Sequence, residues 1–395
     1  MISVAEALDR LLALCAPVGT EEAELRRACG RVLAADVTAR RDQPPFAASA
    51  MDGYAVGAGD HHAGARLRVS GEAGAGHAHR GRVEPGTTVR IFTGAPVPEG
   101  ATHVVLQEDV TREADHVTLG PRIGTETNIR PLGQDFRKGD RVTAPRRLTP
   151  VDLALLAAMN VPRVTVARRP VLAILATGDE LVLPGEDPAP DQIIASNGFA
   201  LAAMAETAGA EARMLPIARD SRESLAQAFD LATGADMIVT IGGASVGDHD
   251  LVGRVGAELG LDLAFWKVAI RPGKPLMAGR LGSQILLGLP GNPVSAIVCG
   301  QIFMRPMIRA LLGLPPVVDA PLMAELAADL APNGPRQHYM RARIDRSAGR
   351  LCIHPYAQQD SALLRLLSEA EALLVRPPDD PARKAGEMVG YLPLG

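Results

Sequence analysis

Short, unbroken runs of apolar residues recur between about residues 168 and 316. The runs at 170–176, 237–241 and 285–289 are typical of buried strands, because each is short and is followed by turn-forming residues. Helical patterns lie between them, one of which begins near Ser196. Strands that alternate with helices predict a three-layer α/β domain with a mostly parallel sheet. Ligands of such sheets bind beyond the carboxyl ends of the strands.

The segments on either side of residues 43–135 have a more helical pattern. Apolar residues near the N-terminus recur with helical period, and Thr20 with the acids after it resembles a second, capped helix start. Further on, Thr149 as cap and Pro150 at the first helical position predict a helix that ends before residue 160. We expect residues 1–42 and 136–167 to form one helical and extended linking domain.

Two other regions have the pattern of β structure. Between residues 43 and 135, strand-like runs alternate with Pro and Gly turns, which predicts a small β domain. A pair of prolines at 315–316 marks a boundary, and alternating runs at 340–344 and 387–392 predict a C-terminal β domain over 317–395. The expected fold is therefore a multidomain chain, α/β plus β.

Composition supports several domains and excludes some partners. The chain has 395 residues, of which 47% are hydrophobic, and a chain of this length is too long for one ordinary hydrophobic core. A net charge of −4 and only 3% aromatic residues give no general attraction to nucleic acid. Glu6 and Asp9 interrupt the apolar N-terminus, no run reaches the roughly 20 apolar residues of a membrane span, and four scattered cysteines contain no Cys-x-x-Cys pair. We expect a cytoplasmic protein with reduced thiols and no membrane partner.

The loop after the 237–241 run is rich in glycine and ends in acids. Gly243 and its neighbours let backbone N–H groups approach an anion closely, and Ser245 adds a hydroxyl donor. A tight strand-to-helix turn is the plainer alternative for a single Gly-Gly pair. Neither a Rossmann nor a Walker glycine pattern is present, so the loop lacks the fingerprints of dinucleotide and P-loop sites.

Several carboxylates are candidates for one cleft, where a bound cation would offset their repulsion. Alternatives remain open for some of them. Asp52 stands in an Asp-Gly step that could be a simple turn, Asp135 could be a loop hydrogen-bond acceptor, and Asp220 is at least as suited to capping a helix. The complete set is Asp52, Asp135, Glu180, Asp220, Asp248 and Asp250.

A cationic segment lies between the glycine-rich loop and the last apolar run. Lys267 and Arg271 share a face of an extended segment, and the turn that follows can bring Lys274 to the same side, which makes an oxyanion site. Pro290 and Pro293 flank a helix start whose amides can receive phosphate, although a plain helix start needs no ligand. Solvated surface lysines are the alternative for the first group.

Four histidines stand in loops rich in Gly and Ala. They lack a helical His-x3-His spacing, so solvated loop side chains are favoured over a metal site. They are His61, His62, His77 and His79.

Motifs in a fixed order give a resemblance that covers nearly the whole chain. They are residues 44–55, 91–95, 128–130 with 133–135, 176–181, 240–250, 265–267 with 271–275, and 288–295. In this order they resemble the molybdopterin molybdenumtransferase family, to which the C-terminal domain of gephyrin is related. Two departures stand out: Arg271 occupies a position where the family usually has Lys, and Tyr356–Ser361 replaces a glycine-rich segment that bears a serine.

The resemblance implies an enzyme that inserts molybdenum from molybdate into adenylylated molybdopterin and releases AMP. It implies Asp52, Glu180 and Asp250 as catalytic acids and as ligands of a Mg²⁺ cofactor. It implies ten substrate-binding residues: Thr93, Arg130, Asp135, Gly243, Ser245, Lys267, Arg271, Lys274, Pro290 and Pro293.

The resemblance also implies a homodimer and makes the molybdopterin adenylyltransferase a candidate partner. Two other functions stay open. The chain could itself be a molybdopterin adenylyltransferase, which shares the α/β module, although the Asp52 segment and the flanking β domains argue against this. It could also be a non-catalytic scaffold that uses the same fold to bind peptides, against which the retained acids argue.

Overall fold

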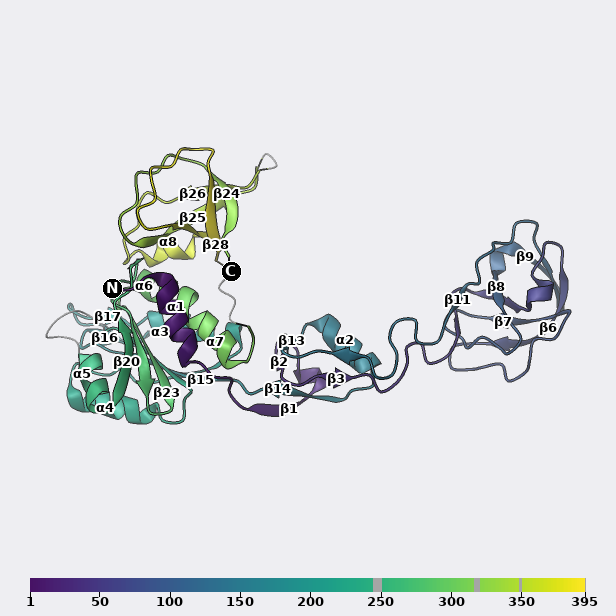
Figure 1. Cartoon of the computed structure of the whole chain (residues 1–395), viewed down its shortest axis with the longest axis horizontal. Coiled ribbons are helices and arrows are strands. Elements are labelled where there is room, and N and C mark those ends of the chain that lie inside the picture. The colour runs from purple at the N-terminus through teal and green to yellow at the C-terminus, as the bar shows by residue number, and fades with distance from the viewer. Residues whose placement is uncertain (244–250, 316–319, 348–349, 395) are drawn as a thin grey trace. The chain divides into compact units, whose positions relative to one another are not determined.

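The computed structural model describes residues 1–243, 251–315, 320–347 and 350–394. The chain divides into two compact units (Figure 1). The larger comprises Met1–Glu21 and Ala167–Gly395, and the smaller comprises Glu22–Val166.

A six-stranded sheet forms the centre of the α/β domain in the larger unit, in the order β18-β15-β19-β23-β22-β20. The first four strands are parallel, and β22 and β20 extend the sheet in the antiparallel sense. The bounds are β15 (Val171–Ala176), β18 (Glu211–Met214), β19 (Met237–Ile241), β20 (Leu261–Trp266), β22 (Met277–Leu281) and β23 (Gln284–Leu289). The three strands predicted from apolar runs are confirmed as three neighbours, β15, β19 and β23.

Helices cover both faces of this sheet, as the sequence predicts (Figure 1). Phe229 of α4 and Val255 of α5 pack with Leu175 and Ile238 on one face. On the other face, α3 lies against β15, so that Gly198 faces Ile174. The bounds are α3 (Asn197–Ala208), α4 (Arg222–Leu231), α5 (Leu251–Glu258), α6 (Pro293–Cys299) and α7 (Arg305–Leu311), with a π-helical stretch, Gly300–Met304, between the last two.

Among the described residues, one continuous helix, Pro293–Leu311, has the length and apolar content to cross a membrane. Within its apolar window 72% is buried inside the fold. That burial is typical of a core helix, and weighs against a membrane role.

The N-terminal helix α1 (Val4–Leu14) contacts α7, β20 and β22 and belongs to the larger unit. Val4, Leu8 and Leu11 are buried there, which confirms the predicted amphipathic helix. We expected residues 1–42 in the linking domain, but in the structure the first 21 group with the α/β domain.

A barrel-like C-terminal domain completes the larger unit. Its strand order is β21-β25-β26-β24-β28-β27, and an additional β25–β27 pairing closes the sheet. The elements are β21 (Ile270–Arg271), β24 (Leu322–Leu326), β25 (Gln337–Asp345), β26 (Cys352–Pro355), β27 (Ala372–Arg376), β28 (Met388–Pro393) and helix α8 (Leu364–Ser368). The β structure expected at 340–344 and 387–392 is confirmed. Since β21 comes from the α/β domain, backbone pairing joins the two domains.

In the smaller unit, residues 22–42 and 136–166 share a hydrophobic core that includes Leu33, Val142 and Leu156. Helix α2 (Pro150–Ala158) has Thr149 as its N-cap in a capping box with Asp152, as predicted. The remaining elements are β1 (Thr20–Glu24), a 3₁₀ turn (Leu25–Arg27), β2 (Val32–Leu33), β3 (Val37–Thr38), β12 (Arg141–Val142), β13 (Arg146–Arg147) and β14 (Arg163–Ala167).

The helix predicted to begin at Thr20 is wrong, because Thr20–Glu24 is strand β1 beside β14. Only Ala23 of this strand is buried. Three glutamates among five residues offer no apolar stripe that a helix could bury, so strand pairing decides the conformation.

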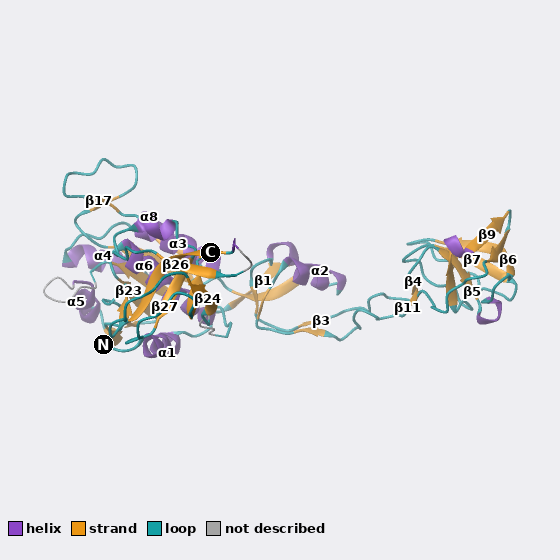
Figure 2. Cartoon of the chain, turned by 90° about the horizontal axis from the view of Figure 1, so that it is seen from above, coloured by secondary structure: helices purple, strands orange, loops and turns teal. Residues whose placement is uncertain are grey.

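Residues 43–135 of the smaller unit form almost only strands and loops (Figure 2), which confirms the predicted β structure. The main sheet has the order β8-β5-β7-β6-β10-β9. Its strands are β5 (Gly53–Val56), β6 (Arg66–Ala73), β7 (Thr87–Ile91), β8 (His103–Leu106), β9 (Val110–Glu113) and β10 (His116–Leu119), and β4 (Ala48–Ser49) pairs separately with β11 (Ile129–Arg130).

Candidate functional site

A cavity of about 970 Å³ lies beyond the carboxyl ends of β15, β19 and β23. Residues that directly follow these strands line it: Gly178 and Glu180 after β15, Gly242 and Gly243 after β19, and Pro290 to Pro293 after β23. This is the place that the parallel-sheet argument predicts for a ligand.

Backbone conformation at the floor of the cavity requires glycine. Gly242 and Gly243 have φ angles of 92° and 65°, and an added Cβ would lie 2.9 Å from the Thr177 carbonyl oxygen and 2.4 Å from a Val252 methyl, respectively. The glycines are therefore needed for the turn itself. That geometry fulfils the plainer of the two interpretations of the loop, and it also leaves the backbone open to a ligand in the cavity.

Glu180 folds its carboxylate over the backbone of Gly178. A Cβ placed on Gly178, whose φ is 151°, would lie 2.4 Å from Oε2 of Glu180. Within the described part of the chain, the Glu180 carboxylate makes no hydrogen bond or ion pair. The carboxylate therefore occupies space that any larger side chain at position 178 would fill.

Cations also line the cavity. Arg271 and Lys274 lie there as predicted, and the C-terminal domain adds Arg336. His338, which pairs with Arg271 across β21 and β25, is buried; burial and the nearby arginines lower its pKa to about 4. It is neutral at pH 7, so the positive charge comes from the arginines and Lys274.

Lys267 does not line this cavity among the described residues. Its φ is 70°, and its Nζ lies 4.3 Å from the centroid of the Trp266 ring, in a cation–π contact. The described lining of the cavity thus includes Arg271 and Lys274 but not Lys267, with which we grouped them by spacing. A left-handed backbone at Lys267 breaks the extended alternation on which that grouping depended.

The C-terminal domain supplies a loop that the sequence led us to discount. Gln359, Asp360 and Ser361 line the cavity, and the Asn292 side-chain amide donates a 3.0 Å hydrogen bond to Oγ of Ser361. Arg341, which is 1% exposed, holds this loop by donating to Oε1 of Gln359 and to the carbonyls of residues 358 and 363. The loop reaches the cavity without the expected glycines.

Among the described residues, the carboxylates that line the cavity are Glu180, Asp220 and Asp360. Asp220 is not a helix cap, because Ser221 accepts the capping hydrogen bond from the Ser224 amide. No three His, Cys, Asp or Glu side chains of the described residues gather tightly enough to hold a metal alone. Mg²⁺ commonly takes one or two carboxylates and fills its other positions with water and phosphate oxygens, so the residues present fit Mg²⁺ held jointly with a phosphate ligand.

A second cluster lies in the smaller unit around Asp52. Oδ1 of Asp52 accepts hydrogen bonds from the Thr93 amide at 2.7 Å and from its hydroxyl at 2.8 Å. These two bonds, with a smaller contribution from Arg90, lower the pKa of Asp52 from its ordinary 3.8. The simple-turn interpretation is therefore wrong, since Asp52 binds a residue 41 positions away.

Gly53 explains why glycine follows the acid. A Cβ there would lie 1.9 Å from the Val105 carbonyl oxygen of the neighbouring strand β8, so no larger residue fits without a backbone shift. A hollow of about 590 Å³ in the same unit is lined by Gly94, Arg130 and Asp135 together with residues of the 43–48 segment. Arg130 and Asp135 thus line one hollow, and Gly94, which follows Thr93 in the chain, lines it with them.

Three predicted acids and hydroxyls, Ser245, Asp248 and Asp250, lie outside the described residues. Of the loop histidines, His61 stacks on His103 with ring centroids 4.0 Å apart. Arg336 was missed entirely, because nothing in its local sequence distinguishes it from other loop arginines.

Comparisons with known proteins agree along the whole chain. Three family descriptions match in order: "MoeA N-terminal region (domain I and II)" at residues 2–160, "Probable molybdopterin binding domain" at 173–310 and "MoeA C-terminal region (domain IV)" at 323–394. A molybdopterin molybdenumtransferase of Haemophilus influenzae is 37% identical over 79% of this chain and 78% of its own length. One from Nostoc sp. is 35% identical over 95% of this chain and 89% of its own.

A solved structure of a molybdopterin biosynthesis MoeA protein from Pyrococcus horikoshii superposes with a TM-score of 0.85 at 28% identity and covers 100% of both chains. The sequence matches, the fold and the order of the domains all agree with this family. The chain belongs to the molybdopterin molybdenumtransferase, or MoeA, family of enzymes.

Proposed function

We propose that the protein inserts molybdenum from molybdate into adenylylated molybdopterin and releases AMP. The observation that carries the proposal is the 970 Å³ cavity, which is large enough for a nucleotide-sized ligand and has both cations and acids in its lining. Three cationic and three acidic side chains of the described residues balance in formal charge. A dianionic oxometalate can therefore approach a polyanionic pterin there without a strongly negative field.

In this proposal the cations hold the oxyanions. Arg271 and Arg336 offer planar forks that suit phosphate or molybdate oxygens, and Lys274 offers a point charge. Ser361 and the backbone around Pro290 and Pro293 add neutral donors. Ser245 and Gly243 are assigned to the same ligand by the family resemblance.

Glu180 is proposed to act on water. Water attacks a phosphorus of the pyrophosphate bridge, the bond to the bridging oxygen breaks, and AMP leaves; Glu180 takes the proton that the water loses. Asp52, held anionic by Thr93, is proposed to place a cation, and Asp250 is assigned alongside it by resemblance. These acids would hold Mg²⁺, which when bound would supply positive charge to offset that of the phosphate oxygens.

We further propose a cytoplasmic homodimer with composite sites, each combining the Asp52 region of one subunit with the α/β domain of the other. Thr93, Arg130 and Asp135 would then contact the substrate from the subunit that contributes Asp52. A two-fold contact makes two such sites. Mixed dimers of Asp52→Asn and Glu180→Gln subunits should then recover about half of the wild-type rate, since both defects fall in one site. No recovery in a purified heterodimer would exclude the shared site.

The test of function is AMP release from adenylylated molybdopterin with and without molybdate. Molybdate-dependent AMP release supports the proposal. ATP consumption with unadenylylated molybdopterin would instead identify an adenylyltransferase. A variant Asp52→Asn that restores molybdenum-enzyme activity to a deletion strain as well as wild type would favour a scaffold. Pull-down against the adenylyltransferase tests that enzyme as a substrate-delivering partner.

A further inference from the structure

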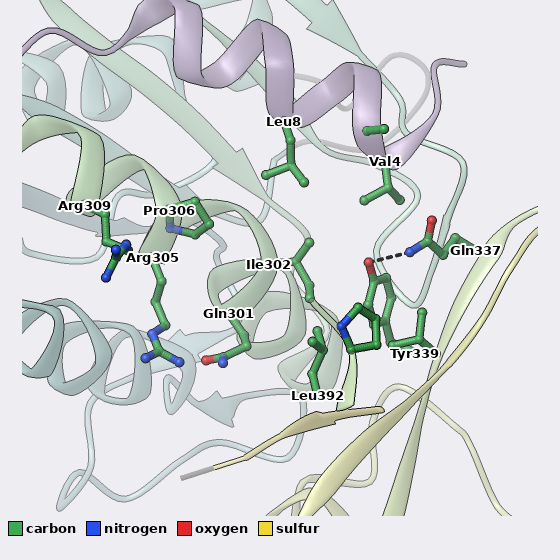
Figure 3. Close-up of a pocket in the computed structure, with 13 residues that line it drawn as sticks. Val4, Leu8, Gln301, Ile302, Arg305, Pro306, Arg309, Gln337, Tyr339 and Leu392 are labelled. Carbon is green, nitrogen blue, oxygen red and sulfur yellow. Dashed lines mark hydrogen bonds between the residues drawn. The ribbon is translucent and has the colours of Figure 1, made fainter. Parts of the chain in front are cut away.

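A second, smaller cavity of about 250 Å³ lies in the larger unit, away from the residues that line the first (Figure 3). Helix α1, the π-helical stretch with α7, and strands of the C-terminal domain enclose it. It shares no lining residue with the larger cavity. Neither the proposed reaction nor any of the sequence motifs uses it.

One end of this cavity is apolar. Val4 and Leu8 project from α1, and Ile302 and Leu392 lie with them on the same side (Figure 3). At this end the Gln337 side-chain amide donates a 2.7 Å hydrogen bond to the Tyr339 hydroxyl, so these two polar side chains bond to each other. This end therefore suits the hydrocarbon part of a ligand.

The other end carries two arginines from one face of α7, Arg305 and Arg309, with Gln301 beside them (Figure 3). Four residues apart on a helix, the two positive charges repel each other. Within the described residues neither guanidinium has a hydrogen-bond or ion-pair partner, and the cavity lining contains no carboxylate.

Nε of Arg309 is also buried without a hydrogen-bond acceptor among the described residues. A buried donor left unpaired is costly, and most such groups in native proteins have a partner. This end of the cavity thus offers two positive charges whose N–H donors no described group uses.

We propose that this cavity binds a small amphipathic carboxylate. Its hydrocarbon body packs against Val4, Leu8 and Ile302, and its carboxylate accepts hydrogen bonds from Arg305 and Arg309. The planar forks of two arginines match carboxylate oxygens. A volume of about 250 Å³ is at or below the lower end for ligand sites, which excludes a pterin nucleotide and selects a fragment with one ring or a short branched chain.

The probe is 3-phenylpropionate, titrated by calorimetry into the full chain, with 3-phenylpropanamide and acetate as controls for charge and for the apolar body. We expect saturable binding of the carboxylate, at least tenfold weaker binding of the amide, and none of acetate. Arg305→Gln and Arg309→Gln should each weaken 3-phenylpropionate by about 10- to 100-fold, the range for one charged hydrogen bond.

Two further variants control for folding and net charge. Arg365→Gln removes an exposed arginine on α8 that pairs with Glu369 and should bind like wild type. Ala5→Trp adds bulk at an exposed lining position without removing a core contact and should block binding, even if Arg309→Gln fails to fold. No saturable binding to wild type, or equal binding by wild type, Arg305→Gln and Ala5→Trp, overturns the proposal.

Discussion

Replacing Gly178 with alanine tests whether the position of the Glu180 carboxylate is essential to catalysis. The added methyl would lie 2.4 Å from Oε2 and 2.8 Å from both Cδ and Oε1 of Glu180. Ordinary contacts of this kind are about 3.5–4 Å, so the carboxylate must move by about 1 Å or more. It can move readily, because it is the end of a flexible side chain with no hydrogen bond among the described residues.

The stability cost should come mainly from the backbone, and the catalytic cost should be the larger of the two. Backbone strain from alanine at a φ of 151° is on the order of 1–3 kcal/mol. A displacement of about 1 Å at a catalytic group can lower the rate by roughly 10²-fold. We expect Gly178→Ala to fold and to lose most of its molybdate-dependent AMP release, with kcat affected more than KM.

Gly185→Ala is the matched control. Gly185 lies in the loop after β16 (Leu181–Val182), before β17 (Ile193–Ile194), has a φ of 97°, and has nothing within 4 Å of an added Cβ. It reports the strain of a left-handed alanine without displacing a side chain. If Gly178→Ala retains as much activity as Gly185→Ala at equal melting temperature, the position of Glu180 is not critical and its proposed role fails.

Three further outcomes are expected. Asp52→Asn should fold with a slightly lower melting temperature near pH 7, because Asn keeps the acceptor for Thr93 but loses the anion. It should lower AMP release by about 10²- to 10⁴-fold, and wild-type turnover would refute the assignment. Because the pKa of Asp52 is lowered from 3.8, its stabilising contribution is present above pH 3.8 and is lost as pH falls through the lower folded pKa. Thr93→Val removes one of the hydrogen bonds, so the pH at which this contribution is lost should move toward 3.8. The measurement is melting temperature against pH, with Asp52→Asn as the reference that lacks the titrating group. Arg341→Met should release the Gln359 loop and weaken molybdate binding in calorimetry more than Arg365→Gln does.

The α/β domain could be predicted from the sequence because its signals are local. The buried strands β15, β19 and β23 are continuous apolar runs, and the residues after them meet at one edge by the geometry of parallel sheets. Glu180 and Pro290 could therefore be placed in one cavity before any coordinates were known. The capped start of α2 at Thr149 is equally local.

Contacts between distant segments could not be predicted in the same way. Arg336 and Ser361 reach the cavity only because β25 pairs with β21 and because buried Arg341 shapes the loop that follows β26. No local pattern encodes either event. For Lys267 the spacing suggested a face shared with Arg271, but its backbone is left-handed and its ammonium group lies over the Trp266 ring, so the side-chain direction could not be predicted from alternation.

The two described acids proposed for catalysis are held in different ways, and the difference supports the roles proposed for them. Asp52 has two hydrogen bonds from Thr93 that favour its anion, so its charge and position are fixed at neutral pH. Glu180 has no such partner among the described residues, and its carboxylate lies in the space over Gly178. A group that must accept a proton and then release it gains nothing from donors that stabilise its anion, whereas a group that positions a cation does. Glu180 is thus the better general base and Asp52 the better cation-positioning acid.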